Sequence, residues 1–172
     1  MSTNDIKIRG TAGLAAVPTY VWQVDDRTTT SATTHIHQGE FAKQYATDSQ
    51  YVVPLVDADL TVATDYLVVG LAKNESTETS TVNGEVELYM PLPGIIYEIA
   101  TLLTASADTQ AEIDALKGQG FVLDLASEKF TADIAAGSAA TNGFKVVGGD
   151  YTRQVIYFVL VDSATFLGRV VV

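Results

Sequence analysis

Hydrophobic and polar residues alternate over much of the chain after residue 50, in short runs bounded by Asp, Asn and Gly. Residues 51–56 and 66–72 are rich in β-branched and aromatic side chains, which pack well on a pleated surface. Both runs therefore predict strands.

The clearest turn signal is Asn83-Gly84, which lies between the alternating segments 77–82 and 85–90. Asn-Gly readily supplies the positive φ angles of a type I′ turn, so these residues predict a β-hairpin. In the second segment the glutamates fall on one face and the apolar residues on the other, which indicates a half-buried strand.

Residues 91–94 read Pro-Leu-Pro-Gly and remove two backbone donors, so we expect the chain to leave the sheet and change direction there. Residues 154–161 are apolar on both faces, which predicts a central strand. Further strands are expected at residues 95–100, 121–125, 144–147 and 168–172.

One helix is predicted at about residues 109–117. Thr109 and Glu112 have the spacing of a capping box, in which each side chain bonds a free backbone amide. Ile113 and Leu116 give a narrow apolar face, and Gly118 is suited to end the helix. We expect this short helix to cross over one end of the sheet.

Short strands with frequent turns and one helix predict a mainly β fold, either an antiparallel β-sandwich or a partly open β-barrel. Residues 1–45 differ from residues 46–172, which form the predicted β-domain. The first segment contains small and Thr-rich stretches around the strand candidate Tyr20-Val-Trp-Gln-Val24. It is predicted to be an N-terminal arm that orders on a partner, or a set of strands added to the main sheet.

The net charge of the 172-residue chain is −11, and residues 1–45 contribute none of it. Nucleic-acid binding needs clustered Lys and Arg, and an acidic body is repelled by phosphates and by anionic lipid. The apolar run at 155–161 is far short of the roughly 20 residues of a membrane helix. We therefore expect neither nucleic acid nor a membrane as a partner.

The strongest metal-site candidate is His35-Ile-His37, whose imidazoles would share one face of a strand. Two ligands are too few, and nearby Glu40 would have to be the third. Histidines in a polar, Thr-rich segment are usually solvated, so we predict no metal site there. Asp57 and Asp59 also share a face, but no calcium-loop spacing follows them, and a turn is the better interpretation.

No pattern of a catalytic triad, a nucleophile elbow or a phosphate-binding loop is present, and the chain has no cysteine. We therefore predict no catalytic and no cofactor-binding residues, and a protein that is not an enzyme. Tyr20 and Trp22 lie outside the tightly alternating region. They are the candidates for an interface anchor, because large aromatic side chains dominate binding energy, although core packing is the more common role.

Three segments carry a resemblance to a known family. They are Val69-Gly-Leu-Ala72, Asn83-Gly-Glu-Val-Glu-Leu-Tyr89 and Pro93-Gly-Ile-Ile-Tyr-Glu98, within residues 63–98. This course resembles the capsid decoration (cement) proteins of tailed bacteriophages. The similarity extends loosely to residues 158–159, and residues 1–45 are not part of it.

The resemblance implies a viral structural protein that binds the major capsid protein on the outer capsid surface of the virion as a homotrimer. It would stabilise the shell by bridging neighbouring capsomers. Two alternatives stay open, which are another virion subunit (head fibre base, tail or baseplate) and a carbohydrate- or receptor-binding β-sandwich.

Overall fold

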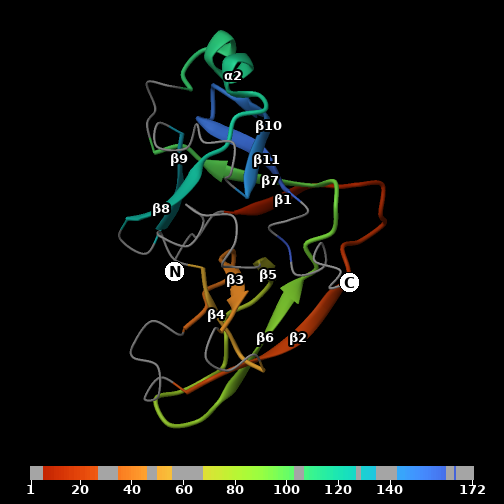
Figure 1. Cartoon of the computed structure of the whole chain (residues 1–172), viewed down its shortest axis with the longest axis vertical. Coiled ribbons are helices and arrows are strands. Elements are labelled where there is room, and N and C mark those ends of the chain that lie inside the picture. The colour runs from red at the N-terminus through yellow and green to blue at the C-terminus, as the bar shows by residue number, and fades with distance from the viewer. Residues whose placement is uncertain are drawn as a thin grey trace.

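The computed structural model describes residues 6–26, 35–45, 50–55, 68–102, 107–126, 129–134, 143–161 and 165. Within these residues the protein is mainly β, with three antiparallel sheets, none closed into a barrel, and one short α-helix (Figure 1). The predicted mainly β, sandwich-like fold is confirmed. The strand predicted at residues 168–172 lies outside the described residues, as do Asp57 and Asp59.

The first sheet has four strands and carries the helix at its far end (Figure 1). Their order is β1 (Lys7–Thr11), β7 (Ile95–Ala100), β11 (Val155–Leu160) and β10 (Phe144–Asp150). β11 pairs with a strand on each side, so the central position predicted from its apolar character is confirmed.

The second sheet has five strands in the order β2 (Thr19–Val24), β6 (Gly84–Tyr89), β5 (Val68–Ala72), β3 (Phe41–Gln44) and β4 (Val52–Pro54). It curls so that a single bridge between Gln23 and Tyr51 brings its two outer strands together. Pro54 lies on the outer strand β4, where a missing backbone donor is tolerated. Of the first 45 residues, β1 joins the first sheet, and β2 and β3 join the second.

The third sheet is a hairpin of β8 (Val122–Ala126) and β9 (Lys129–Asp133). The helix α2 (Gln110–Leu116) precedes it, and Thr109 and Glu112 form both hydrogen bonds of the predicted capping box. Gly118 follows with φ +81°, the left-handed conformation expected at a helix end. Buried Ile113 is the apolar residue that α2 contributes to the core.

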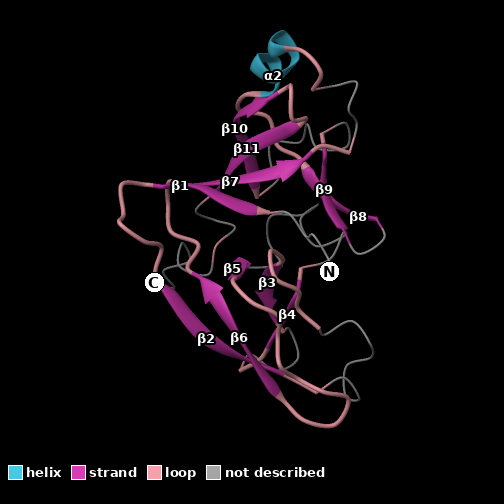
Figure 2. Cartoon of the chain, turned by 180° about the vertical axis from the view of Figure 1, so that it is seen from behind, coloured by secondary structure: helices cyan, strands magenta, loops and turns pink. Residues whose placement is uncertain are grey.

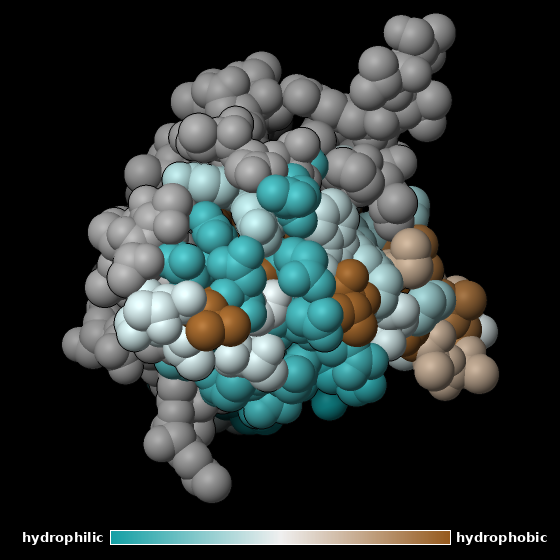
Figure 3. Space-filling view, turned by 90° about the horizontal axis from the view of Figure 1, so that it is seen from below, coloured by the Kyte–Doolittle hydropathy of each residue, from teal (hydrophilic) through white to brown (hydrophobic). Residues whose placement is uncertain are grey.

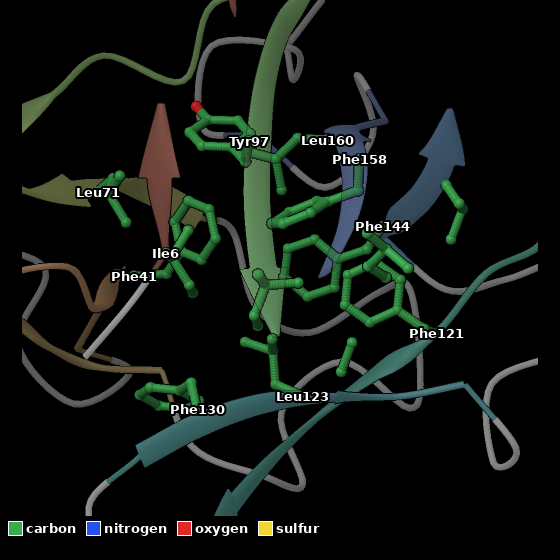
Figure 4. Packing of buried hydrophobic residues seen from close by; sticks show 14 of the residues in the cluster. Ile6, Phe41, Leu71, Tyr97, Phe121, Leu123, Phe130, Phe144, Phe158 and Leu160 are labelled. Carbon is green, nitrogen blue, oxygen red and sulfur yellow. The ribbon is translucent and has the colours of Figure 1, made fainter. Parts of the chain in front are cut away.

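The main core lies between the two large sheets and the β8–β9 hairpin. Its centre is a group of aromatic rings in mutual contact, from Phe41, Tyr97, Phe121, Phe144 and Phe158 (Figure 4). The ring centroids are 5.4 Å apart for Tyr97 and Phe158 and 5.2 Å apart for Phe121 and Phe144. Phe41 of β3 reaches across from the five-stranded sheet, with its ring 5.2 Å from that of Tyr97. The two sheets are therefore packed as layers of one body.

A second, smaller core occupies the opposite face of the five-stranded sheet. It includes Val24, Ile36, Val69 and Leu88, with Tyr20 and Trp22 packed against it. Because β5 is covered on both of its faces, every residue of this strand is buried.

The chain passes from one sheet to the other through residues 91–94, between β6 and β7. The change of direction predicted from Pro91 and Pro93 is confirmed.

The predicted type I′ turn is wrong. Neither Asn83 nor Gly84 has a positive φ, and Gly84 is already the first residue of β6. The chain instead turns at residues 79–82, where the Thr79 amide donates to the Val82 carbonyl. Residues 77–78 then run against β6, with the Thr77 amide bonded to the Glu85 carbonyl.

Candidate functional site

The strand β2 carries the two predicted interface residues and lies at the edge of the five-stranded sheet, beside β6 (Figure 2). Tyr20 and Trp22 are half-buried and turn toward the smaller core, with their rings in edge contact at 6.0 Å. Val21 between them faces outward and is 59% exposed. A partner that binds at this edge would therefore contact the exposed Val21 side chain and the exposed parts of the two aromatic rings.

Tyr20 is held in place by its hydroxyl, which donates to the backbone carbonyl of Val69. The pairing of β3 with β5 skips Val69, so this residue is a bulge whose carbonyl needs another partner. Burial raises the pKa of Tyr20 to about 12, against a smaller opposing effect of a hydrogen bond from Trp22. The hydroxyl is therefore a structural donor at ordinary pH.

A cluster of histidine and glutamate side chains forms the second candidate site. One part of it is the segment 35–40, which precedes β3. The Glu40 amide donates to the His37 carbonyl, and Gly39 adopts φ +82° in the β-turn that this bond closes. The Glu40 carboxylate accepts a hydrogen bond of 2.8 Å from the His37 amide. His37 and Glu40 are thus joined by two hydrogen bonds, which stabilise the turn.

The other part of the cluster is the connection between β5 and β6, which places Glu75 and Glu78. The Ser76 amide donates to the Ile36 carbonyl, and the Ser76 hydroxyl accepts the Ile36 amide. These two bonds fix the connection directly beside the histidine segment.

Gly84 allows this placement because a Cβ there would lie 2.0 Å from the Glu78 nitrogen. With no side chain at Gly84, residues 77–78 can pack against the start of β6. The Glu78 side chain is completely buried.

The four side chains meet through their polar atoms. The Glu75 Oε2 atom lies 3.1 Å from His35 Nε2 and 2.8 Å from His37 Nδ1. On the other side of its ring, His35 Nδ1 lies 2.7 Å from Glu78 Oε1. The two imidazole rings are in edge contact, with centroids 4.6 Å apart.

The three carboxylates of the cluster differ in their electrostatics. Burial raises the pKa of Glu40, only partly offset by the His37 amide. Burial also acts to raise the pKa of Glu75 and of Glu78, but hydrogen bonds outweigh it and both pKa values are lowered. The bonds come mainly from His37 and the Gln38 amide for Glu75, and from Ser76 and His35 for Glu78. Glu75 and Glu78 are therefore held as anions beside the imidazoles.

These contacts correct two expectations from the sequence. His35 and His37 are not solvated, since their side chains are only 23% and 29% exposed and both bind carboxylates. Glu40, considered as a third ligand, instead accepts a backbone amide, and Glu75 takes the place beside both rings. Sequence reasoning missed Glu75 and Glu78 because they lie about 40 residues away from the histidines.

The comparisons with known proteins give no relative. No family model, no curated protein and no solved structure matches the chain. In the part of the chain that the structure describes, no helix has the length and apolar character needed to cross a membrane.

Proposed function

We propose that this chain is a structural virion protein that binds the outer surface of a phage capsid. Its partner is the major capsid protein, and it acts as a homotrimer that bridges neighbouring capsomers. The role is one of binding and not of catalysis. Nucleic acid and membrane are not its partners.

The observation that carries the proposal is the position of the residues that resemble decoration proteins. From residue 68 to residue 98 they form β5 and β6 of one sheet, the crossing at 91–94, and β7 of the other sheet. The resemblance therefore concerns the framework that joins the two layers. A shared framework is the kind of similarity that proteins with a common fold and different surfaces retain.

The surface of the described residues suits many weak contacts. Seen from below, the coloured part of this face is largely hydrophilic, with small hydrophobic patches near its centre and a larger group of hydrophobic residues at its right edge (Figure 3). The exposed large apolar residues come from different parts of the chain and are Leu14, Val21, Val82, Leu102, Val147 and Tyr151. Weak contacts repeated over a closed lattice give strong retention, because one subunit stays bound while another contact opens.

The edge strand β2 is the proposed contact surface. Val21 is its most exposed apolar residue, and Tyr20 and Trp22 flank it. Burying Val21 and the exposed parts of these rings against the shell would remove apolar area from water, which is the main favourable term in association.

The experiment mixes the purified protein with capsid shells assembled without it. We expect co-sedimentation, a rise in the temperature at which the shells open, and a trimer mass in light scattering. Val21→Asp places a charge at the proposed contact and should weaken co-sedimentation at least tenfold. Tyr151→Ala removes an exposed aromatic residue outside β2 and serves as the matched control.

The outcomes separate the alternatives. Absence of co-sedimentation together with unchanged shell stability would overturn the proposal. A ring or fibre in solution would favour another virion subunit. Binding to a glycan array that is lost in Trp22→Ala would favour a carbohydrate-binding role.

A further inference from the structure

We propose that His35, His37 and Glu75 form a binding site for one Zn²⁺ ion, with Glu78 as a positioning residue behind His35. This inference concerns the histidine–glutamate cluster alone and does not depend on capsid binding.

The three donor atoms already converge. One ligand atom from each of the three residues lies within 4.8 Å of the others. In a tetrahedral zinc site with bonds of about 2.0–2.2 Å, neighbouring ligand atoms are about 3.3 Å apart. The observed separations of 3.1 Å and 2.8 Å from Glu75 Oε2 to the two imidazole nitrogens need to open by only a few tenths of an ångström.

The hydrogen-bonding groups around His35 are also those expected around a cation. A carboxylate only accepts, and a neutral imidazole has one donor and one acceptor nitrogen. His35 has a carboxylate oxygen beside each ring nitrogen. Two species satisfy this arrangement: a doubly protonated ring that donates to both carboxylates, or a neutral ring with a metal ion between His35 Nε2 and Glu75.

Glu78 has the position of a supporting carboxylate in a metal site. Metal-bound histidines commonly donate their other ring N–H to a carboxylate, which fixes the tautomer and the ring orientation. The buried Glu78 carboxylate lies 2.7 Å from His35 Nδ1. It would hold the proton on Nδ1 and direct the lone pair of Nε2 toward Glu75.

The types of ligand atom in the site determine which metal ions it would bind. Two imidazoles with one carboxylate suit Zn²⁺ and related transition metals, whereas Ca²⁺ and Mg²⁺ prefer oxygen ligands. The side chain of Glu75 is 52% exposed, so solvent has access and a water molecule can complete the tetrahedron. The bound ion would tie the β5–β6 connection to the segment before β3.

The test is calorimetric titration of ZnCl₂ into the full chain, freed of any histidine tag and treated with chelator. We expect one Zn²⁺ per chain and a higher melting temperature with Zn²⁺ but not with Ca²⁺ or Mg²⁺. Titration with Co²⁺ should give visible absorption bands of a four-coordinate site.

Four variants locate the site. Glu75→Gln and His37→Ala should each weaken Zn²⁺ binding at least tenfold, and Glu78→Gln by about 10–100-fold. Glu85→Gln, an exposed carboxylate on the same sheet, should change the affinity less than twofold.

Saturable binding that is lost in Glu75→Gln and kept in Glu85→Gln supports the site. Because the Glu75 side chain is half exposed, this variant should fold, and its far-UV circular dichroism checks that directly. If His37→Ala fails to fold, the comparison of Zn²⁺ binding by Glu75→Gln and Glu85→Gln tests the site by itself. No saturation by about 1 mM Zn²⁺, or equal affinity in Glu75→Gln, overturns the site and leaves capsid binding unaffected.

Discussion

Arg153 and Glu98 face each other in a two-bond ion pair across 55 positions of sequence. The guanidinium nitrogens lie 3.1 Å and 2.5 Å from the two carboxylate oxygens. The Arg9 side chain approaches the same carboxylate at 3.8 Å. Since Glu98 is in β7, Arg9 in β1 and Arg153 in the turn between β10 and β11, the buried carboxylate connects three parts of the four-stranded sheet.

Glu98→Gln should therefore lower the free energy of unfolding by about 1–2 kcal/mol, since it removes the charge that two arginines share. The effect stays below that of a fully buried pair because the Arg153 side chain is 46% exposed. Urea unfolding at pH 7 measures it. The control is Glu87→Gln, which removes the charge from the more exposed pair with Lys73 and should lower the free energy of unfolding less than Glu98→Gln does. Equal losses in the two variants would show that burial adds nothing to the Glu98 pair.

Gly84→Ala should destabilise the fold by about 1–3 kcal/mol, the usual cost of forcing an extra carbon into a packed site. The new methyl group would lie 2.0 Å from the Glu78 nitrogen, so residues 77–78 must move away from β6. Chemical denaturation measures the loss. Gly148→Ala is the control, because a Cβ there meets nothing closer than 3.7 Å and should change stability by less than about 0.5 kcal/mol. Similar values for both variants would contradict the close approach at Gly84.

The elements that the sequence predicted well are those whose cause is local. The helix at Gln110–Leu116 follows from Thr109 and Glu112, whose capping bonds span three residues. The strand β11 follows from its own apolar composition. For both elements, the sequence pattern that predicts the element lies within the element or next to it.

The type I′ turn predicted at Asn83-Gly84 does not form, because the close packing of residues 77–78 against Gly84 outweighs the preference of this residue pair for positive φ angles. The pair is suited to positive φ, but here Gly84 is needed for its missing side chain, against residues 77–78. The histidine–glutamate cluster could not be foreseen for a related reason. His35 meets Glu78 across 43 positions, so only the pairing of the two segments brings them together.

The half-buried Tyr20 and the fully buried Tyr97 provide two hydroxyl deletions for comparison. Tyr20 donates to the Val69 carbonyl, whereas the Tyr97 hydroxyl is buried and has no hydrogen-bond partner among the described residues. At pH 7, Tyr20→Phe should cost about 1 kcal/mol for the lost bond. Tyr97→Phe should be neutral or should stabilise by up to about 1–2 kcal/mol, since an unsatisfied polar atom leaves the core. Chemical denaturation compares them, and a clear loss in Tyr97→Phe would mean that its hydroxyl has a partner.

Alkaline pH should remove the advantage of the wild type over Tyr20→Phe. The pKa of Tyr20 is raised from 10.0 to about 12 by burial, so between these values the unfolded chain binds fewer protons than the folded chain. The free energy of unfolding then falls as pH rises, by roughly 1 kcal/mol at pH 11 for this group. Tyr20→Phe lacks the titrating hydroxyl, and the groups that titrate alike in the two proteins cancel in the difference.

Unfolding of both proteins at pH 8, 10 and 11 measures this effect. The difference in unfolding free energy should be constant up to about pH 10 and should shrink above it, because the pKa of the unfolded tyrosine lies there. A difference that stays constant to pH 11 would mean that the Tyr20 hydroxyl ionises as easily in the folded protein as in the unfolded chain. Its bond to Val69 would then not be shielded from water, and β2 would be packed more loosely against β5 than the structure has it.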